Sequence, residues 1–171
     1  TFNVNTFLRI SDIKELKHRH IEVNEGKVKY LLIQPEVSKT KYNSPVTSMP
    51  EAVEIYKDII EYHKSHDNPH SKNDYVFFPK IENRTFALDT IRRLFNRILE
   101  VAELKTNASG DERTLYSLRH SSISFRLIRS DVDMLTLAKN ARTSVEMLER
   151  FYTSAVTSSD TVKKIQSNRK E

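Results

Sequence analysis

Cysteine does not occur in the 171 residues of this chain, and internal repeats, low-complexity tracts and long apolar runs are also missing. Without cysteine the chain forms no disulfide, offers no thiol nucleophile and builds no cysteine-ligated zinc site. Its apolar stretches fall short of the ~18 residues of a membrane-spanning helix, and no signal-peptide pattern opens the chain. These absences predict a protein of a reducing interior, such as the cytoplasm, without a membrane partner.

The composition is that of an ordinary globular domain. Apolar residues make up 37% and charged residues 30%, which argues against intrinsic disorder. Lysine and arginine number 28 against 23 aspartate and glutamate residues, so the formal net charge is +5. This modest excess is compatible with a polyanionic partner but does not establish one. The chain enters apolar periodicity at once, in TFNVNTFLRI, which indicates a piece of a longer protein.

Apolar spacing and turn residues predict a mostly helical chain with a small antiparallel sheet near its front. A hairpin is expected around Asn24-Glu25-Gly26, in the middle of the alternating stretch 20–37, and residues 38–48 can add a third strand. Residues 75–79 form a further short strand or extended piece. Helices are expected at residues 6–17, 52–63, 85–104, 114–128, 132–141 and 143–152. The predicted fold class is therefore α+β.

Two of these helices carry more detailed expectations. The inward face of helix 85–104 is expected to consist of its regularly spaced apolar residues, Ile91, Leu94, Phe95, Ile98 and Ala102. Thr143 and Glu146 have the spacing of a capping box, so the last helix is expected to begin near residue 144.

A few residues combine unusual positions with suitable chemistry. Arg9 lies in an apolar helical stretch with Asp12 one turn later, and Arg119 lies in the equally apolar helix 114–128. A guanidinium cannot lose its charge by a pKa shift, so burying it requires a partner. Lys39 lies in a polar turn, and Tyr152 ends the last predicted helix. Two guanidiniums, an ammonium and a phenol are the groups that covalent phosphodiester cleavage requires, and this chemistry needs no metal or other cofactor.

The order of these residues resembles that of the tyrosine recombinases, the phage integrase family. FLRISDIKEL resembles the family's first arginine box, T-G-L-R-I-S-E-L, and SKTKYNSPVTSMP resembles its β-hairpin lysine segment. YSLRHSSISFRLI and the following stretch to FYT resemble the second box, in which H-x-L-R-H is followed at a similar interval by R-Y-T. The resemblance covers residues 6–154, with the segments in the family's order.

The resemblance implies a role for each matching position. Arg9 and Arg119 would clamp the non-bridging oxygens of the scissile phosphate. Tyr152 would attack phosphorus, form a 3′-phosphotyrosyl linkage and release a 5′-hydroxyl. Lys39 would be the general acid that protonates the leaving oxygen, with Lys41 as the alternative.

Other matching positions would support this chemistry, and two of them depart from the family pattern. His120 would pack beneath the site, with Asp12 as a partner that orients it. Tyr116 stands where the family has a histidine before the second arginine, and it can still donate a hydrogen bond to a phosphate oxygen. The pair Arg142-Thr143 replaces Gly-His or Gly-Trp, and Asn140 is a candidate for the missing role.

The resemblance also implies partners and organisation. The partner would be double-stranded DNA, on which family members act as homotetramers, and we expect a monomer or a tail-swapped oligomer without DNA. Residues 1–154 would be a catalytic domain without the family's DNA-clamping domain, and 155–171 a tail exchanged between protomers. The expected location is the bacterial cytoplasm, at the nucleoid. Candidates for DNA-backbone contacts are Lys41, Arg92, Arg93, Arg97, Arg126, Arg129 and Arg142.

The predicted function is site-specific recombination or integration for a mobile element, by cleavage and rejoining of DNA strands. Two alternatives remain open. One is DNA relaxation like that of type IB topoisomerases, which uses similar residues. The other is a DNA-binding module that has lost catalysis, which the departures at Tyr116 and Thr143 make conceivable. Either arginine alone would also fit a structural role, paired with a carboxylate such as Asp12 or Glu103.

Overall fold

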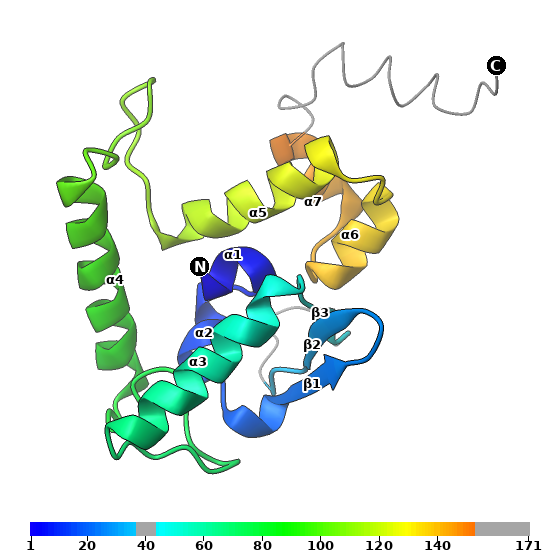
Figure 1. Ribbon diagram of the computed structural model, residues 1–171. Coiled ribbons are helices and arrows are strands. Elements are labelled where there is room, and N and C mark those ends of the chain that lie inside the picture. The colour runs from blue at the N-terminus through cyan, green and yellow to red at the C-terminus, as the bar shows by residue number, and fades with distance from the viewer. Residues whose placement is uncertain (37–43, 153–171) are drawn as a thin grey trace.

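The computed structural model describes residues 1–36 and 44–152 (Figure 1). This part of the chain is mostly helical and has a small three-stranded antiparallel sheet near its start, which confirms the predicted α+β class. None of its helices is both long and apolar enough to span a bilayer. The helices are α1 (Phe2–Thr6), α2 (Ile10–Glu15), α3 (Glu51–Ser65), α4 (Arg84–Val101), α5 (Leu115–Arg129), α6 (Met134–Asn140) and α7 (Val145–Tyr152), with a 3-10 turn, η1, at His18–His20.

The sheet confirms the predicted hairpin and third strand. Strands β1 (Ile21–Glu25), β2 (Lys29–Ile33) and β3 (Val46–Thr47) lie in sequence order, with β2 in the centre. The turn between β1 and β2 is closed by the Gly26 amide, which donates to the Asn24 side-chain oxygen at 3.0 Å. Such a side-chain turn explains why an Asn-Glu-Gly sequence reverses the chain here.

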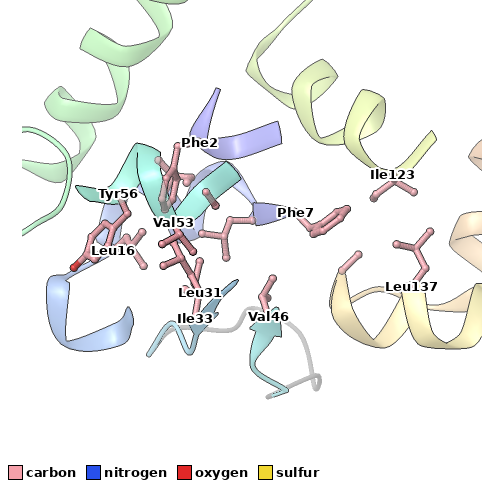
Figure 2. Packing of buried hydrophobic residues seen from close by; sticks show 14 of the residues in the cluster. Phe2, Phe7, Leu16, Leu31, Ile33, Val46, Val53, Tyr56, Ile123 and Leu137 are labelled. Atoms are coloured by element: carbon pink, nitrogen blue, oxygen red, sulfur yellow. The ribbon is translucent and has the colours of Figure 1, made fainter. Parts of the chain in front are cut away.

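The core lies between the sheet, α1 and α3, and it continues beneath α5 and α6 (Figure 2). Leu31 and Ile33 of β2 are fully buried against the side of α3 that carries Val53 and Tyr56. Helix α1 packs against both α3 and α5, so the start of the chain joins the two halves of the core. Phe7 follows α1, and its ring points toward Ile123 and Leu137 in Figure 2.

The predicted single helix over residues 6–17 is wrong. The chain breaks into α1 and α2 because Phe7 adopts a left-handed conformation with φ 55°, after which Arg9 is extended. Apolar spacing continues through the break, since the side chains on both sides of it enter the same core. Residues 75–79 form no regular strand, only an isolated bridge between Tyr75 and Lys17, with a left-handed residue at Phe78.

The predicted inward face of α4 is wrong in part, although Ile91 does pack against the core. Leu94 and Ile98 are 53% and 63% exposed, whereas the buried apolar residues of the helix are Ala87, Leu88 and Leu99. Figure 1 shows α4 standing to one side of the other helices, and its neighbour among the elements is α2. A helix with one narrow contact leaves its other apolar residues in solvent.

The last helix begins close to the predicted position but with a different cap. Helix α7 starts at Val145, and the Ser144 hydroxyl accepts a hydrogen bond from the Met147 amide at 3.2 Å. Ser144 is therefore the capping residue in place of Thr143, because its oxygen is the one that reaches a free amide of the first turn.

Candidate active site

The break between α1 and α2 places Arg9 at the N-cap of α2. The Arg9 amide donates to the Asp12 carboxylate at 3.1 Å, so the acidic residue of the first turn fixes the backbone from which the arginine projects. A carboxylate at this position accepts from a backbone amide that has no partner within the helix. Its negative charge also interacts favourably with the positive end of the helix dipole. The departure from a continuous helix thus gives Arg9 its direction.

Arg119 comes from the second turn of α5, whose first turn is capped by the Thr114 hydroxyl. Its side chain is only 3% exposed. The guanidinium donates to the Phe7 carbonyl and, at 2.5 Å, to the Ala141 carbonyl. Arg119 therefore bridges the break after α1 and the turn between α6 and α7.

The turn after α6 brings the two arginines together. The Arg9 guanidinium donates at 2.5 Å to the carbonyl of Arg142, the residue that follows Ala141. Both guanidiniums therefore end on consecutive carbonyl oxygens of one turn, although they lie 110 residues apart in the sequence. The two arginines that the sequence singled out do converge, and neither is bound to Glu103 in the contacts described here.

Arg142 completes the cluster, although the sequence predicted a contact with DNA for it. It was expected to contact the DNA backbone, but its side chain is 2% exposed and its guanidinium lies 3.4 Å from the Asp12 carboxylate. Its backbone is left-handed, with φ 53°, and its side chain contacts Asp12 of α2. A usable signal was the glycine of the family pattern at this position, since glycine favours that conformation.

The cluster holds three guanidinium groups and one buried carboxylate, Asp12. Burial raises the pKa of Asp12 above its ordinary value, and the charges of Arg142, Arg9 and Arg119 counteract this effect. The contact described for Asp12 is thus with Arg142 and with the Arg9 amide, and the expected pairing with His120 is not among the contacts described. An arrangement of this kind concentrates positive charge around one small region.

His120 lies beside the arginines with a perturbed pKa. Burial, followed by the neighbouring Arg119 charge, lowers the pKa of His120 below its ordinary value, so its imidazole is neutral at pH 7. The Tyr116 ring meets the His120 ring edge-on, with centroids 4.6 Å apart. Tyr116 is 47% exposed and also lines a cavity of about 430 Å³ together with Arg92 and Lys105.

Asn140 holds the sheet in place beside the cluster. Its amide oxygen accepts from the Thr47 amide at 2.8 Å, and its amide nitrogen donates to the Thr47 carbonyl at 3.0 Å. The side chain thus extends the ladder of β3 by one pair. Thr143 is half-buried, and its backbone amide donates to the Ala138 carbonyl, which tightens the end of α6.

The residues predicted as nucleophile and general acid lie at or beyond the limits of the described chain. Tyr152 is the last residue of α7, a helix that packs on α5 and α6, but its side chain lies outside the described part. Lys39 and Lys41 lie outside the described residues altogether, as does the tail 155–171. Their predicted roles therefore stay predictions.

The other predicted DNA contacts lie apart from the cluster. Arg92, Arg93 and Arg97 are exposed on α4, where Arg92 and Arg97 pair with Asp89 and Glu100 one turn away. Arg126 of α5 is half-buried and lines a second cavity, of about 420 Å³. The side chain of Arg129 is outside the described part. Over residues 1–36 and 44–152, no group of three or more histidine and acidic side chains is placed to hold a metal ion.

Two solved structures share the fold of this chain. A crystal structure of XerA recombinase aligns with a TM-score of 0.61 at 17% identity, over 98% of this chain and 56% of that one. The Tn1549 transposon integrase in complex with transposon right end DNA aligns with a TM-score of 0.57 at 13% identity, over 96% and 55%. The chain thus spans about half the length of these proteins. A search of curated proteins gave no match.

The sequence model of the phage integrase family matches residues 1–158. This match includes the stretches that carry Arg9, Arg119 and Tyr152 and covers most of the chain. On this evidence the chain belongs to the phage integrase family.

Proposed function

We propose that this chain is the catalytic part of a site-specific recombinase that cuts and rejoins double-stranded DNA through a 3′-phosphotyrosyl intermediate. The observation that carries the proposal is the convergence of the Arg9 and Arg119 guanidiniums on the carbonyls of Arg142 and Ala141. The convergence brings two cations together, so that one anion can accept from both, and the family membership supports the same activity.

In the proposed reaction, Arg9 and Arg119 bind the non-bridging oxygens of the scissile phosphate. A phosphate oxygen is anionic and therefore a stronger acceptor for a guanidinium than a neutral carbonyl is. The same contacts stabilise the charge that accumulates on the pentacoordinate transition state. Arg142 is paired with Asp12, whereas the guanidiniums of Arg9 and Arg119 donate to the carbonyls of the turn between α6 and α7.

The bond changes balance without a cofactor. The Tyr152 oxygen forms a bond to phosphorus and gives up its proton, and the bond from phosphorus to the 5′ oxygen breaks. Lys39 donates a proton to that departing oxygen, so a free 5′-hydroxyl results. In the second step a 5′-hydroxyl of the partner strand attacks the phosphotyrosine and restores the phenol. We propose that exchange takes place in a homotetramer on two duplexes, with the tail 155–171 reaching a neighbouring protomer.

A suicide DNA substrate, nicked next to the cleavage point, tests the proposal, because loss of a short fragment traps the covalent adduct. We expect an adduct with the wild type and none with Tyr152→Phe. Tyr62→Phe is a matched control, since Tyr62 is 55% exposed on α3 and should leave the adduct unchanged. Arg119→Ala should slow adduct formation by about 10²- to 10³-fold.

The alternatives predict other outcomes in the same assay. Intact DNA binding with no adduct at any site would establish a non-catalytic module and overturn the proposal. An adduct accompanied by relaxation of supercoiled plasmid, with no joining of two duplexes, would establish an activity of the type IB topoisomerase kind.

A further inference from the structure

Three described contacts form a closed circuit through Arg9, Asp12 and Arg142, and a fourth ties Arg119 to the neighbouring residue of the same turn. The Arg142 guanidinium lies 3.4 Å from the Asp12 carboxylate, and that carboxylate accepts from the Arg9 amide at 3.1 Å. The Arg9 guanidinium returns to the Arg142 carbonyl at 2.5 Å, and Arg119 holds the adjacent Ala141 carbonyl at the same distance. The Arg142–Asp12 and Arg9–Arg142 contacts join the start of α2 to the turn between α6 and α7, and the Arg119–Ala141 contact joins α5 to the same turn.

The backbone of Arg142 makes this circuit depend on its side chain. With φ 53° the residue adopts a left-handed conformation, which is unfavourable for residues other than glycine. Its side chain is 2% exposed, and a buried guanidinium without a partner would be costly. The ion pair with Asp12 is the described contact that offsets both costs and fixes the direction of the 141 and 142 carbonyls.

We infer that Arg142 is a positioning residue for the proposed strand cleavage: by pairing with Asp12 it fixes the turn whose carbonyls aim Arg9 and Arg119 at the scissile phosphate. The inference rests on the proposed function and adds a residue that the family pattern does not supply, since glycine is usual there. Glycine only permits the left-handed backbone, whereas the Arg142–Asp12 pair also ties the turn to α2.

A variant series separates the side chain from the backbone. Arg142→Gly keeps a backbone that adopts positive φ easily and removes the guanidinium, whereas Arg142→Lys keeps a cation. With saturating suicide substrate, we expect Arg142→Gly to slow adduct formation about 10- to 100-fold, because a clamp displaced by about 1 Å loses that much. DNA affinity should change less than about threefold, because most phosphate contacts lie elsewhere. Arg142→Lys should recover part of the rate.

Asp12→Asn should slow the reaction to a similar extent, and combining it with Arg142→Gly should add little, because both changes break one contact. Arg84→Lys is the structural control. Arg84 is also buried and also donates to backbone carbonyls, those of Lys14, Phe77 and Ile81, but away from the cluster. It should lower thermal stability and leave the cleavage rate of the folded protein unchanged.

A wild-type rate in Arg142→Gly would overturn the inference, and so would a loss that Arg84→Lys reproduces at equal thermal stability. Failure of the wild type to form any adduct would instead overturn the proposed function. In that case binding of inorganic phosphate, measured by calorimetry, decides the inference alone. An affinity at least about tenfold weaker in Arg142→Gly supports it, and equal affinity in both proteins overturns it.

Discussion

Two buried arginines, Arg84 and Arg119, show how similar contacts serve different ends. Both guanidiniums donate to backbone carbonyls of distant segments. Arg84 also stacks on the Tyr75 ring at 3.8 Å, and burial lowers its pKa although Tyr75 and Glu15 counteract this effect. Arg119 instead lies in a cluster with two further guanidiniums and Asp12. The sequence does not distinguish the two cases residue by residue, because burial depends on contacts across the whole chain.

His18 should make stability depend on pH. Burial, followed by the nearby His63 ring, lowers the pKa of His18. Its Nδ1 bonds the Tyr56 hydroxyl at 2.8 Å, and its Nε2 has no hydrogen-bond partner among the described residues. The unfolded chain binds a proton near pH 6.5, so the stability from neutral His18 is present above about pH 6.5 and is lost as the pH falls through the lowered folded pKa.

We therefore expect the urea midpoint to fall between about pH 7.5 and pH 5, and His18→Gln to flatten this dependence. Asp12 acts in the opposite direction, because its raised pKa lets the folded carboxyl bind a proton before the unfolded one does. His66→Gln is the control, since His66 is exposed. Equal slopes for His18→Gln and wild type would contradict the prediction.

The cap of α7 gives a second prediction at this scale. Ser144→Ala should lower the free energy of unfolding by about 1 kcal/mol, because the Met147 amide loses its acceptor. Thr143→Ala should cost less, although the sequence favoured Thr143 as the cap. Thermal or chemical denaturation of both variants measures the difference, and a larger loss for Thr143→Ala would restore the capping box.

At the scale of elements, sequence patterns were sufficient to predict the structure where the contacts join residues close together in the sequence. The hairpin follows from alternation and an Asn24–Gly26 turn, and α3 follows from a proline start and one apolar face. The break at Phe7 was not predictable, because its ring and carbonyl are held by α5 and α6. The convergence of Arg9 with Arg119 could be predicted from the order of the family motifs. The Arg142–Asp12 pair could not, because it joins residues far apart in the sequence that no motif links.

Helix α4 carries two apolar stripes, and spacing alone does not reveal which one is buried. Leu94, Ile98 and Val101 follow helical spacing but are 53%, 63% and 71% exposed. Leu99, next to Ile98, is 6% exposed. We expect Leu99→Ala to cost about 2–4 kcal/mol of unfolding free energy.

The neighbouring change, Ile98→Ala, should cost less than about 0.5 kcal/mol, because its side chain has little contact to lose. Denaturation curves of the two variants provide the comparison. A cost for Ile98→Ala that matches that of Leu99→Ala would show that the exposed stripe is covered in solution.

At the scale of the whole molecule, the net charge determines how strongly the proposed binding of DNA depends on salt. The formal net charge of +5 is small, so we expect weak, salt-sensitive binding to DNA of any sequence. Arg92 is the α4 arginine that lines the cavity shared with Tyr116, whose ring contacts His120. Arg92→Gln should reduce the slope of log affinity against log salt by about one.

Arg97→Gln is the matched comparison, because Arg97 is exposed on the same helix but lies outside that cavity. Fluorescence anisotropy over a salt series gives both slopes. If Arg97→Gln lowers the slope as much as Arg92→Gln, DNA contacts α4 along its length, and the cavity has no special part in binding.

Only two glycines occur in the chain, yet left-handed backbone appears at Phe7 and Arg142, on either side of the clamp. Phe7 has its ring in the interior and its carbonyl on Arg119. A change in the packing around Phe7 should therefore also affect the proposed strand cleavage. We expect a substitution at Ile123 or Leu137, chosen only to alter packing, to shift the Phe7 ring and to slow the proposed strand cleavage before any folded protein is lost.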